Sequence, residues 1–234
     1  MKKTLLFGLA LLLAGSVFAA DSSPKDEILA AAKALGEKAN YAWKTTVTVP
    51  EDARWKPGPT EGKTEKDGYT HVKMSFGDNS MEAIMKGDKG AALTPDGGWQ
   101  SFSELENAEG PGRFIGGMVR SFKNPADQIK QLAGLAKELK KDGDAVTGDL
   151  TEEGAKSLQT MRFGGGDGPT IANAKGSVKF WLKDGAVAKY EFKLKGTVSF
   201  NGNDFENDRT SLVEVKEVGT TKVTVPEEAK KKAS

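Results

Sequence analysis

The chain contains no cysteine, which excludes disulfide bonds and also a lipid anchor on a cysteine thiol. Histidine occurs once, as His71, so a transition-metal site built from histidine and cysteine ligands is close to excluded. His71 shares one face of an alternating segment with Tyr69, Lys73 and Ser75, and the sequence suggests no partner that would orient it for catalysis. We therefore interpret His71 as a surface strand residue and expect the fold to be held by its apolar core alone.

Signature motifs of catalytic and nucleotide-binding sites are also missing, among them G-x-S-x-G, H-E-x-x-H and the Walker loop. The glycine-rich stretch "RFGGGDGPT" lacks the lysine and the following hydroxyl residue that a phosphate-binding loop needs, so we interpret it as an ordinary loop. "NGNDFENDR" is rich in oxygen ligands, but their order does not match a calcium loop, and Asn201-Gly202 is typical of a hairpin turn. The sequence thus predicts no enzyme, no cofactor and no metal site.

No excess of one charge is present, because 34 lysines and arginines are balanced by 33 aspartates and glutamates. Such a balance does not favour nucleic acid or an anionic membrane surface as a partner. Long apolar runs are confined to the start, where "MKKTLLFGLALLLAGSVFAAD" has the pattern of a secretory signal peptide. We predict cleavage after Ala19, with Ala20 as the alternative. The expected products are a signal peptide at 1–19 and a periplasmic single domain at 20–234, without a membrane span.

The segment after the predicted cleavage site begins with a helix and continues with short strands. "SSPKDEILAAAKALGEKAN" has Ser23 as its N-cap and an apolar face that includes Ile28 and Leu35, which predicts a helix. A strand over 41–49 and a polar loop over 51–68 are expected next. Gly-Asp and Asp-Gly-Gly turn signals then separate "YTHVKMSF", "MEAIMKG", "KGAALTP" and "GWQSF", which predicts an antiparallel meander.

The middle of the chain has a different character. "EGPGRFIGGMVRSFK" sets large apolar residues beside glycines, a composition that we interpret as a mobile flap. A helix is expected to follow over 124–143, with Asn124 as its N-cap and Gly143 as its end. "LTEEGAKSLQTM" predicts a shorter helix.

Strands return in "GSVKFWLKDG", "AVAKYEFKLKGTVSF", "DRTSLVEVKEVG" and "TTKVTVP", and the tail over 227–234 is expected to be frayed. The stretch 188–200 alternates throughout, with Tyr190, Phe192 and Leu194 on one face and charged residues on the other. At ~3.3 Å per residue this strand would run roughly 43 Å. The order of elements predicts an α+β fold, in which a strongly curved antiparallel sheet, an unclosed half-barrel, is wrapped around the helices.

Several of these stretches resemble a known family. "VKMSFGDNSMEAIMKGDKGAALTPDGGWQSF" is similar to the hairpin series of the periplasmic outer-membrane lipoprotein carriers, the LolA-like family. "KFWLKDGAVAKYEF" resembles a later hairpin of that family, and "VEVKEVGTTKVTVPEEA" its final strand pair. The resemblance covers most of residues 24–229 and extends to the related mycobacterial lipid-transport lipoproteins. It implies an unclosed barrel around helices, with an acyl chain in the hollow.

The resemblance and the residues together predict non-enzymatic, periplasmic binding or transport of a lipid or lipoprotein acyl chain in an apolar hollow. Envelope proteins are further candidate partners. The alternative is a structural or protein-interaction domain of the same fold, whose hollow is filled by its own side chains. The residues expected to line or gate the hollow are Met74, Phe76, Met85, Trp99, Phe114, Met118, Phe122, Trp181, Phe192 and Leu194.

Overall fold

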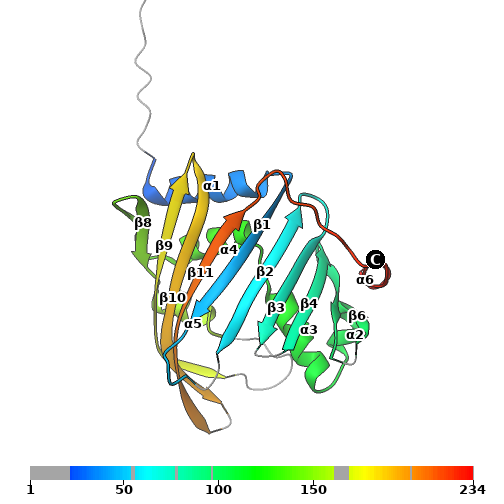
Figure 1. Cartoon of the computed structure of the whole chain (residues 1–234). Helices are drawn as coiled ribbons and strands as arrows, with labels where there is room; N and C mark the ends of the chain where they lie inside the picture. The colour runs from blue at the N-terminus through cyan, green and yellow to red at the C-terminus, as the bar shows by residue number, and fades with distance from the viewer. Residues whose placement is uncertain are drawn as a thin grey trace, which may run out of the picture.

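The computed structural model describes residues 22–53, 56–76, 79–95, 97–160, 169–200 and 202–233. The predicted signal peptide and most of the glycine-rich stretch 162–170 lie outside these residues. Eleven strands form one antiparallel sheet in the order β6-β5-β4-β3-β2-β1-β11-β10-β9-β8-β7 (Figure 1). The first strand, β1, and the last, β11, are paired neighbours at the middle of this order. The predicted α+β class is therefore confirmed.

The first helix and strand form as the sequence predicts. α1 spans Pro24–Gly36, and the side chain of Ser23 accepts a hydrogen bond from the backbone N–H of Asp26. β1 spans Asn40–Thr48 and pairs with β11, which spans Asn203–Lys216. The two halves of the sheet are joined by this pairing of the first and last strands.

The first meander has one more strand than expected, because the predicted polar loop contains β2, Pro57–Glu65. Gly62 is one of its residues on the helix side, and a Cβ atom there would overlap the indole ring of Trp43. A side chain is thus excluded beneath the indole ring, so β2 lacks the apolar alternation that reveals a half-buried strand. The strands that were predicted are confirmed: β3 (Thr70–Phe76), β4 (Asn79–Lys86), β5 (Lys89–Leu93) and β6 (Trp99–Ser101).

The middle of the chain is more helical at its start and less helical at its end than predicted. α2 (Phe102–Glu106), α3 (Pro111–Ser121) and α4 (Pro125–Leu135) follow one another. The predicted helix over 124–143 was wrong beyond Leu135. The chain instead forms the hairpin β7 (Lys140–Asp142) and β8 (Ala145–Asp149), which turns at Gly143 with a φ of 60°. α5, Glu152–Ser157, is confirmed.

Three of the glycines before α4, Gly112, Gly116 and Gly117, are part of the helix α3, and Gly110 precedes it as the N-cap residue. A Cβ atom on Gly116 would approach Cβ of Leu105 to 3.1 Å, so this glycine lets α3 pack closely against α2. Close packing therefore explains at least one glycine that the sequence analysis attributed to mobility. The mobility of the segment stays a prediction.

The second meander consists of the longest strands, β9 (Thr170–Lys183), β10 (Ala186–Phe200) and β11. β10 confirms the long strand expected over 188–200. The strand expected over 220–226 was wrong, because these residues run outside the sheet toward α6, Glu227–Lys232. The tail is also not frayed over its whole length, since Ala229 of α6 is fully buried against the sheet.

The sheet has two distinct faces, which we call the inner and the outer face. α1, α3 and α4 lie behind the sheet in Figure 1, on the inner face, while most of the outer face is bare. The core lies between the inner face and these helices, and includes Ile28 and Leu35 of α1, Ile129 of α4 and Phe180 of β9. The sheet is open at β6 and β7 and is not strongly curled, so the strong curvature expected from the sequence is not confirmed.

Candidate functional site

The apolar face of β10 points inward, toward the helices. Tyr190 and Leu194 are fully buried and Phe192 is half-buried. The hydroxyl of Tyr190 donates a hydrogen bond of 2.6 Å to Oε1 of Gln128 on α4, and burial raises the pKa of Tyr190 well above its ordinary value. This bond connects the long strand to the helix layer.

Side chains do not fill all the space between the two layers. A cavity of about 680 Å³ lies between the inner face, the end of α3, α4 and the end of α5. We call it the inner cavity. Ligand pockets in proteins are typically about 300–1,000 Å³. Its lining residues come from β1, β2, β3, β10, β11 and the three helical segments, and they are Trp43, Thr45, Thr60, Met74, Arg120, Ser121, Phe122, Lys123, Pro125, Gln128, Gln131, Ser157, Leu158, Thr160, Tyr190, Phe192 and Arg209.

One wall of the inner cavity is aromatic. Trp43 of β1 and Phe122 after α3 stack with ring centroids 6.1 Å apart and an angle of 23° between the planes. Tyr41 packs against the other side of this pair, with its centroid 5.9 Å from that of Trp43, and donates its hydroxyl hydrogen to Oδ1 of Asn124. Burial raises the pKa of Tyr41 to about 12. The ring of Phe122 thus joins the end of α3 to the sheet at the cavity.

The polar part of the lining carries positive charge. Among the described residues, the lining includes Arg120, Lys123 and Arg209 but no aspartate or glutamate. Nη1 of Arg120 lies 2.7 Å from a carboxylate oxygen of Glu106, which compensates its charge outside the cavity. No such ion pair is formed by Arg209 within the described parts of the chain.

Arg209 lies on β11 opposite Leu194, on the inner face. Its Nη2 donates a hydrogen bond of 3.3 Å to the carbonyl oxygen of Leu158 at the end of α5. Its Nε is buried and has no hydrogen-bond partner among the described residues. Burial lowers the pKa of this guanidinium. A buried donor without a partner is costly, so this atom needs an explanation.

A hydrogen-bonded pair next to Arg209 attaches α5 to the sheet. Gln159 is buried, and its Nε2 donates to the carbonyl oxygens of Ala155 and Lys195 at 3.1 Å. Its Oε1 accepts a bond of 2.6 Å from Nδ2 of Asn207, two residues before Arg209 on the same face of β11. The end of α5 is therefore attached to β11 at two residues, Asn207 and Arg209.

The predicted site residues divide into three groups. Met74, Phe122 and Phe192 line the inner cavity. A second group belongs to the core or packs against it, and its members are Phe76, Met85, Met118 and Leu194. Phe114 on α3 is 43% exposed, and two predicted tryptophans lie elsewhere.

Trp99 and Trp181 lie on the outer face and so do not line the inner cavity. Trp181 pairs with Lys189 in the sheet, and Nζ of Lys189 lies 4.4 Å from its ring centroid. Trp99 is on the edge strand β6 and pairs with Leu93 of β5. The apolar residues of "FWLK" are consecutive, so composition alone did not tell which of them points inward.

Trp43 and Arg209 are lining residues that the sequence analysis missed. Both carried a signal, because each is in phase with the inward residues of its strand. In β11 the alternation runs through Arg209, Ser211, Val213 and Val215. An arginine in phase with an apolar face is unusual and points to a polar function on that face.

The outer face has fewer features of a functional site than the inner face. His71 is half-buried there, with Nε2 4.0 Å from a carboxylate oxygen of Glu82, and desolvation lowers its pKa. Within the described residues there is no cluster of metal-ligating side chains. The helices in the described part of the chain are all too short or too polar to cross a bilayer.

No protein-family model and no curated protein matches this sequence. Solved structures do match its fold. LprF from Mycobacterium bovis is 12% identical, with a TM-score of 0.45 over 89% of this chain and 100% of that one. The lipoprotein LppX from Mycobacterium tuberculosis is 10% identical, with a TM-score of 0.44 over 86% and 97%. A LolA superfamily protein from Nitrosomonas europaea is 8% identical, with a TM-score of 0.34 over 87% and 96%. The matched proteins belong to the groups that the sequence resembles, and the likeness is one of fold.

Proposed function

We propose that the chain binds the acyl part of a lipid or lipoprotein in the inner cavity, as a non-enzymatic binder or carrier in the periplasm. The observation that carries this proposal is an unfilled cavity of about 680 Å³ inside the fold, with an aromatic wall. Each methylene group that leaves water contributes about 0.8 kcal/mol, so an acyl chain can be held there without a specific polar contact. Met74, Phe122 and Phe192 would contact it.

The entry of a long ligand would require movement at the end of α3. Phe122 forms part of the cavity wall and lies directly after this helix. Its neighbour in the chain, Lys123, is exposed, so the cavity meets solvent in this region. We propose that α3 and Phe122, which belong to the stretch "EGPGRFIGGMVRSFK" interpreted above as a mobile flap, act as the gate of the cavity.

A self-filled structural or interaction domain is the second candidate. It is favoured by the part of the core that includes Ile28, Leu35 and Phe180, which are buried and do not line the inner cavity. The two candidates differ in one measurable property, which is whether lipid enters the inner cavity.

Native mass spectrometry of protein purified from the periplasm tests the proposal directly, with bound lipid as the expected result. A matched pair of variants locates the ligand. Thr45 lines the cavity, and Thr46 is its exposed neighbour on the outer face of β1. Thr45→Trp should fill the cavity and reduce binding of the neutral probe Nile red at least tenfold, while Thr46→Trp should leave it unchanged.

Equal binding by the two variants, or no bound lipid and no probe binding in the parent protein, would favour the self-filled domain. Circular dichroism of both variants checks that the fold is retained, so that a loss of binding is not mistaken for unfolding.

A further inference from the structure

Arg209 is placed where the stability of the sheet does not require a charge. Its Nε is buried without a hydrogen-bond partner among the described residues, and only its Nη2 is bonded, to a backbone carbonyl at 3.3 Å. Removing a guanidinium from water is costly unless an anion or several acceptors replace the water. Among the described residues, the acceptor that bonds this guanidinium is the neutral carbonyl oxygen of Leu158.

The neighbouring carboxylate in the sequence does not compensate this charge. Asp208 points to the outer face, where its oxygens lie 2.6 Å from Nζ of Lys195 and 4.0 Å from Nζ of Lys193. Successive residues of a strand point to opposite faces, so Asp208 and Arg209 are separated by the sheet itself. Glu206 lies on the outer face as well, and accepts a hydrogen bond from Thr197.

The lining of the inner cavity is unbalanced in a chain that is otherwise nearly neutral. The whole chain has 34 basic and 33 acidic residues, whereas all the charged residues in the described lining are basic. Arg120 is paired with Glu106, so Arg209 and Lys123 remain the cations without a carboxylate among the described residues. Of these two, Lys123 is exposed, whereas Arg209 is half-buried and its Nε is fully buried.

We propose that Arg209 binds the negatively charged head group of the ligand, and that the ligand of the inner cavity is an anionic amphiphile with a carboxylate or a phosphate next to its acyl chain. This inference rests on the proposed function. Guanidinium forms bidentate, charge-assisted hydrogen bonds with both anions. An anion at this position would give the buried Nε of Arg209 its missing partner.

The geometry leaves room for the acyl chain. Arg209 is four residues along β11 from Val213, which lies in the same row across the sheet as Thr45, Thr60 and Met74. Four residues of a strand span ~13 Å, and the three strand spacings from β11 to β3 span ~14 Å. A chain that starts at Arg209 and runs diagonally toward Met74 would cross β1 and β2 past Thr45 and Thr60, which line the cavity. Phe192 and Tyr190 of β10 line it on the other side of β11.

Four probes with the same sixteen-carbon chain test the head-group assignment by displacement of Nile red. Palmitate carries a carboxylate, hexadecyl phosphate a phosphate, hexadecanol no charge and hexadecyltrimethylammonium a positive charge. We expect both anions to bind at least tenfold more tightly than hexadecanol, and the cation to bind most weakly. The tighter of the two anions identifies the source as a fatty acid or a phosphate lipid.

Two substitutions assign the effect to Arg209. Arg209→Met should weaken both anions by roughly ten- to hundredfold, the range of a lost charge-assisted hydrogen bond, and should change hexadecanol binding less than threefold. Arg209→Lys should restore part of the loss. Lys195→Met on the outer face is the control and should bind all probes like the parent.

The results separate this inference from the proposed function. Equal binding of palmitate and hexadecanol by the parent protein, or an equal loss of both in Arg209→Met, would overturn the head-group role and leave acyl binding intact. If none of the four probes displaces Nile red, the proposed function fails and this inference fails with it. Thermal unfolding of each variant shows whether Arg209 instead only holds the end of α5.

Discussion

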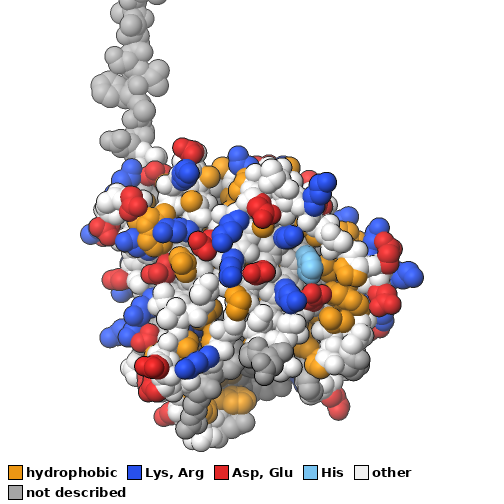
Figure 2. Space-filling view, viewed as in Figure 1, with side chains coloured by type: hydrophobic (Ala, Val, Ile, Leu, Met, Phe, Trp, Pro, Cys, Tyr) orange, Lys and Arg blue, Asp and Glu red, His pale blue; other side chains and the backbone are white. Residues whose placement is uncertain are grey.

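The two faces of the sheet differ in whether their charged side chains have partners of opposite charge. Basic and acidic side chains are interspersed over the outer face (Figure 2). Some of those on neighbouring strands form ion pairs, for example Lys44 with Glu61 and Lys195 with Asp208. On the inner face, Arg209 has no carboxylate partner within the described residues. Exposed ion pairs contribute about 0–1 kcal/mol each, so the outer charges mainly keep that face in water. The inner charge has no such explanation, and this difference is what singles it out.

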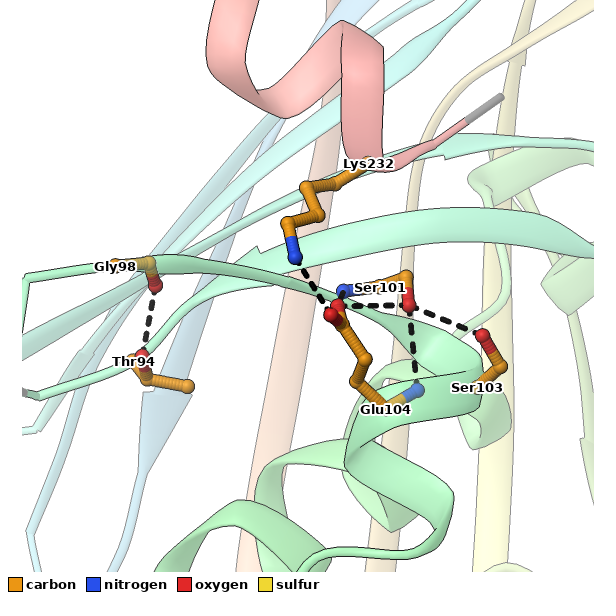
Figure 3. A network of polar contacts seen from close by, with 6 residues as sticks. All are labelled: Thr94, Gly98, Ser101, Ser103, Glu104 and Lys232. Carbon is orange, nitrogen blue, oxygen red and sulfur yellow. Dashed lines mark hydrogen bonds and ion pairs between the residues drawn. The ribbon is translucent and has the colours of Figure 1, made fainter.

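Part of the outer face, at the β6 edge of the sheet, is apolar and is covered by α6. Ile84 of β4 and Ala91 of β5 form a pair that points outward, and both are fully buried. α6, with its fully buried Ala229, packs against β5 and β6 at this edge of the sheet. Figure 3 shows Lys232 of α6 directed at the carboxylate of Glu104, at the start of α2. The last residues of the chain thus act as a cover for an otherwise exposed apolar patch.

The largest expected effect comes from removing an inner side chain of β10. Leu194→Ala should lower the free energy of unfolding by about 2–5 kcal/mol, because it leaves a cavity at a fully buried position. The matched change on the outer face, Lys193→Ala, should cost less than ~0.5 kcal/mol. Urea denaturation of both variants measures the difference, and similar losses would contradict the assignment of the two faces.

A smaller loss is expected when α6 is detached. Ala229→Asp would place a carboxylate at a fully buried position between α6 and the sheet, and should destabilise the fold by about 2–4 kcal/mol or release α6 from the sheet. Lys231→Asp, at an exposed position of the same helix, is the control. Limited proteolysis after residue 226 distinguishes release from global unfolding, and an unchanged digestion pattern in Ala229→Asp would show that the cover is dispensable.

Much of the sheet could be predicted because its strands alternate clearly, and β10 is the best example. β2 could not be predicted, because the indole of Trp43 occupies the space where an inward side chain of Gly62 would lie. The site was predictable only in part. Aromatic residues indicated an apolar hollow, but whether Trp181 or Phe180 faces inward depends on pairing with β10, which only the structure gives.

Binding of lipid should change the dynamics of the inner face and leave the outer face unaffected. Phe122 lines the cavity, so an acyl chain that packs against it should hold the end of α3 in place. We expect amide exchange over 111–122 to slow about tenfold when palmitate is added. This factor corresponds to an increase of ~1.4 kcal/mol in the free energy of local opening. Exchange over α4 and over α6 should stay constant. No change over 111–122 with any lipid would contradict the gate.

The smallest expected effect is a loss of the α6 cover in acid. Hydrogen bonds from Lys232, and from the backbone and side chain of Ser101, lower the pKa of Glu104 to about 2. The folded state therefore keeps this carboxylate ionised at pH values where the unfolded chain, with an ordinary pKa near 4.5, takes up a proton. The resulting stabilisation is complete above about pH 4.5 and disappears as the pH falls toward 2. Because the carboxylate is exposed, the contribution is small and should be visible locally, as faster amide exchange over 227–232. Glu104→Gln should remove this pH dependence while leaving exchange on the inner face unchanged, and an identical acid response in that variant would show that another group is responsible.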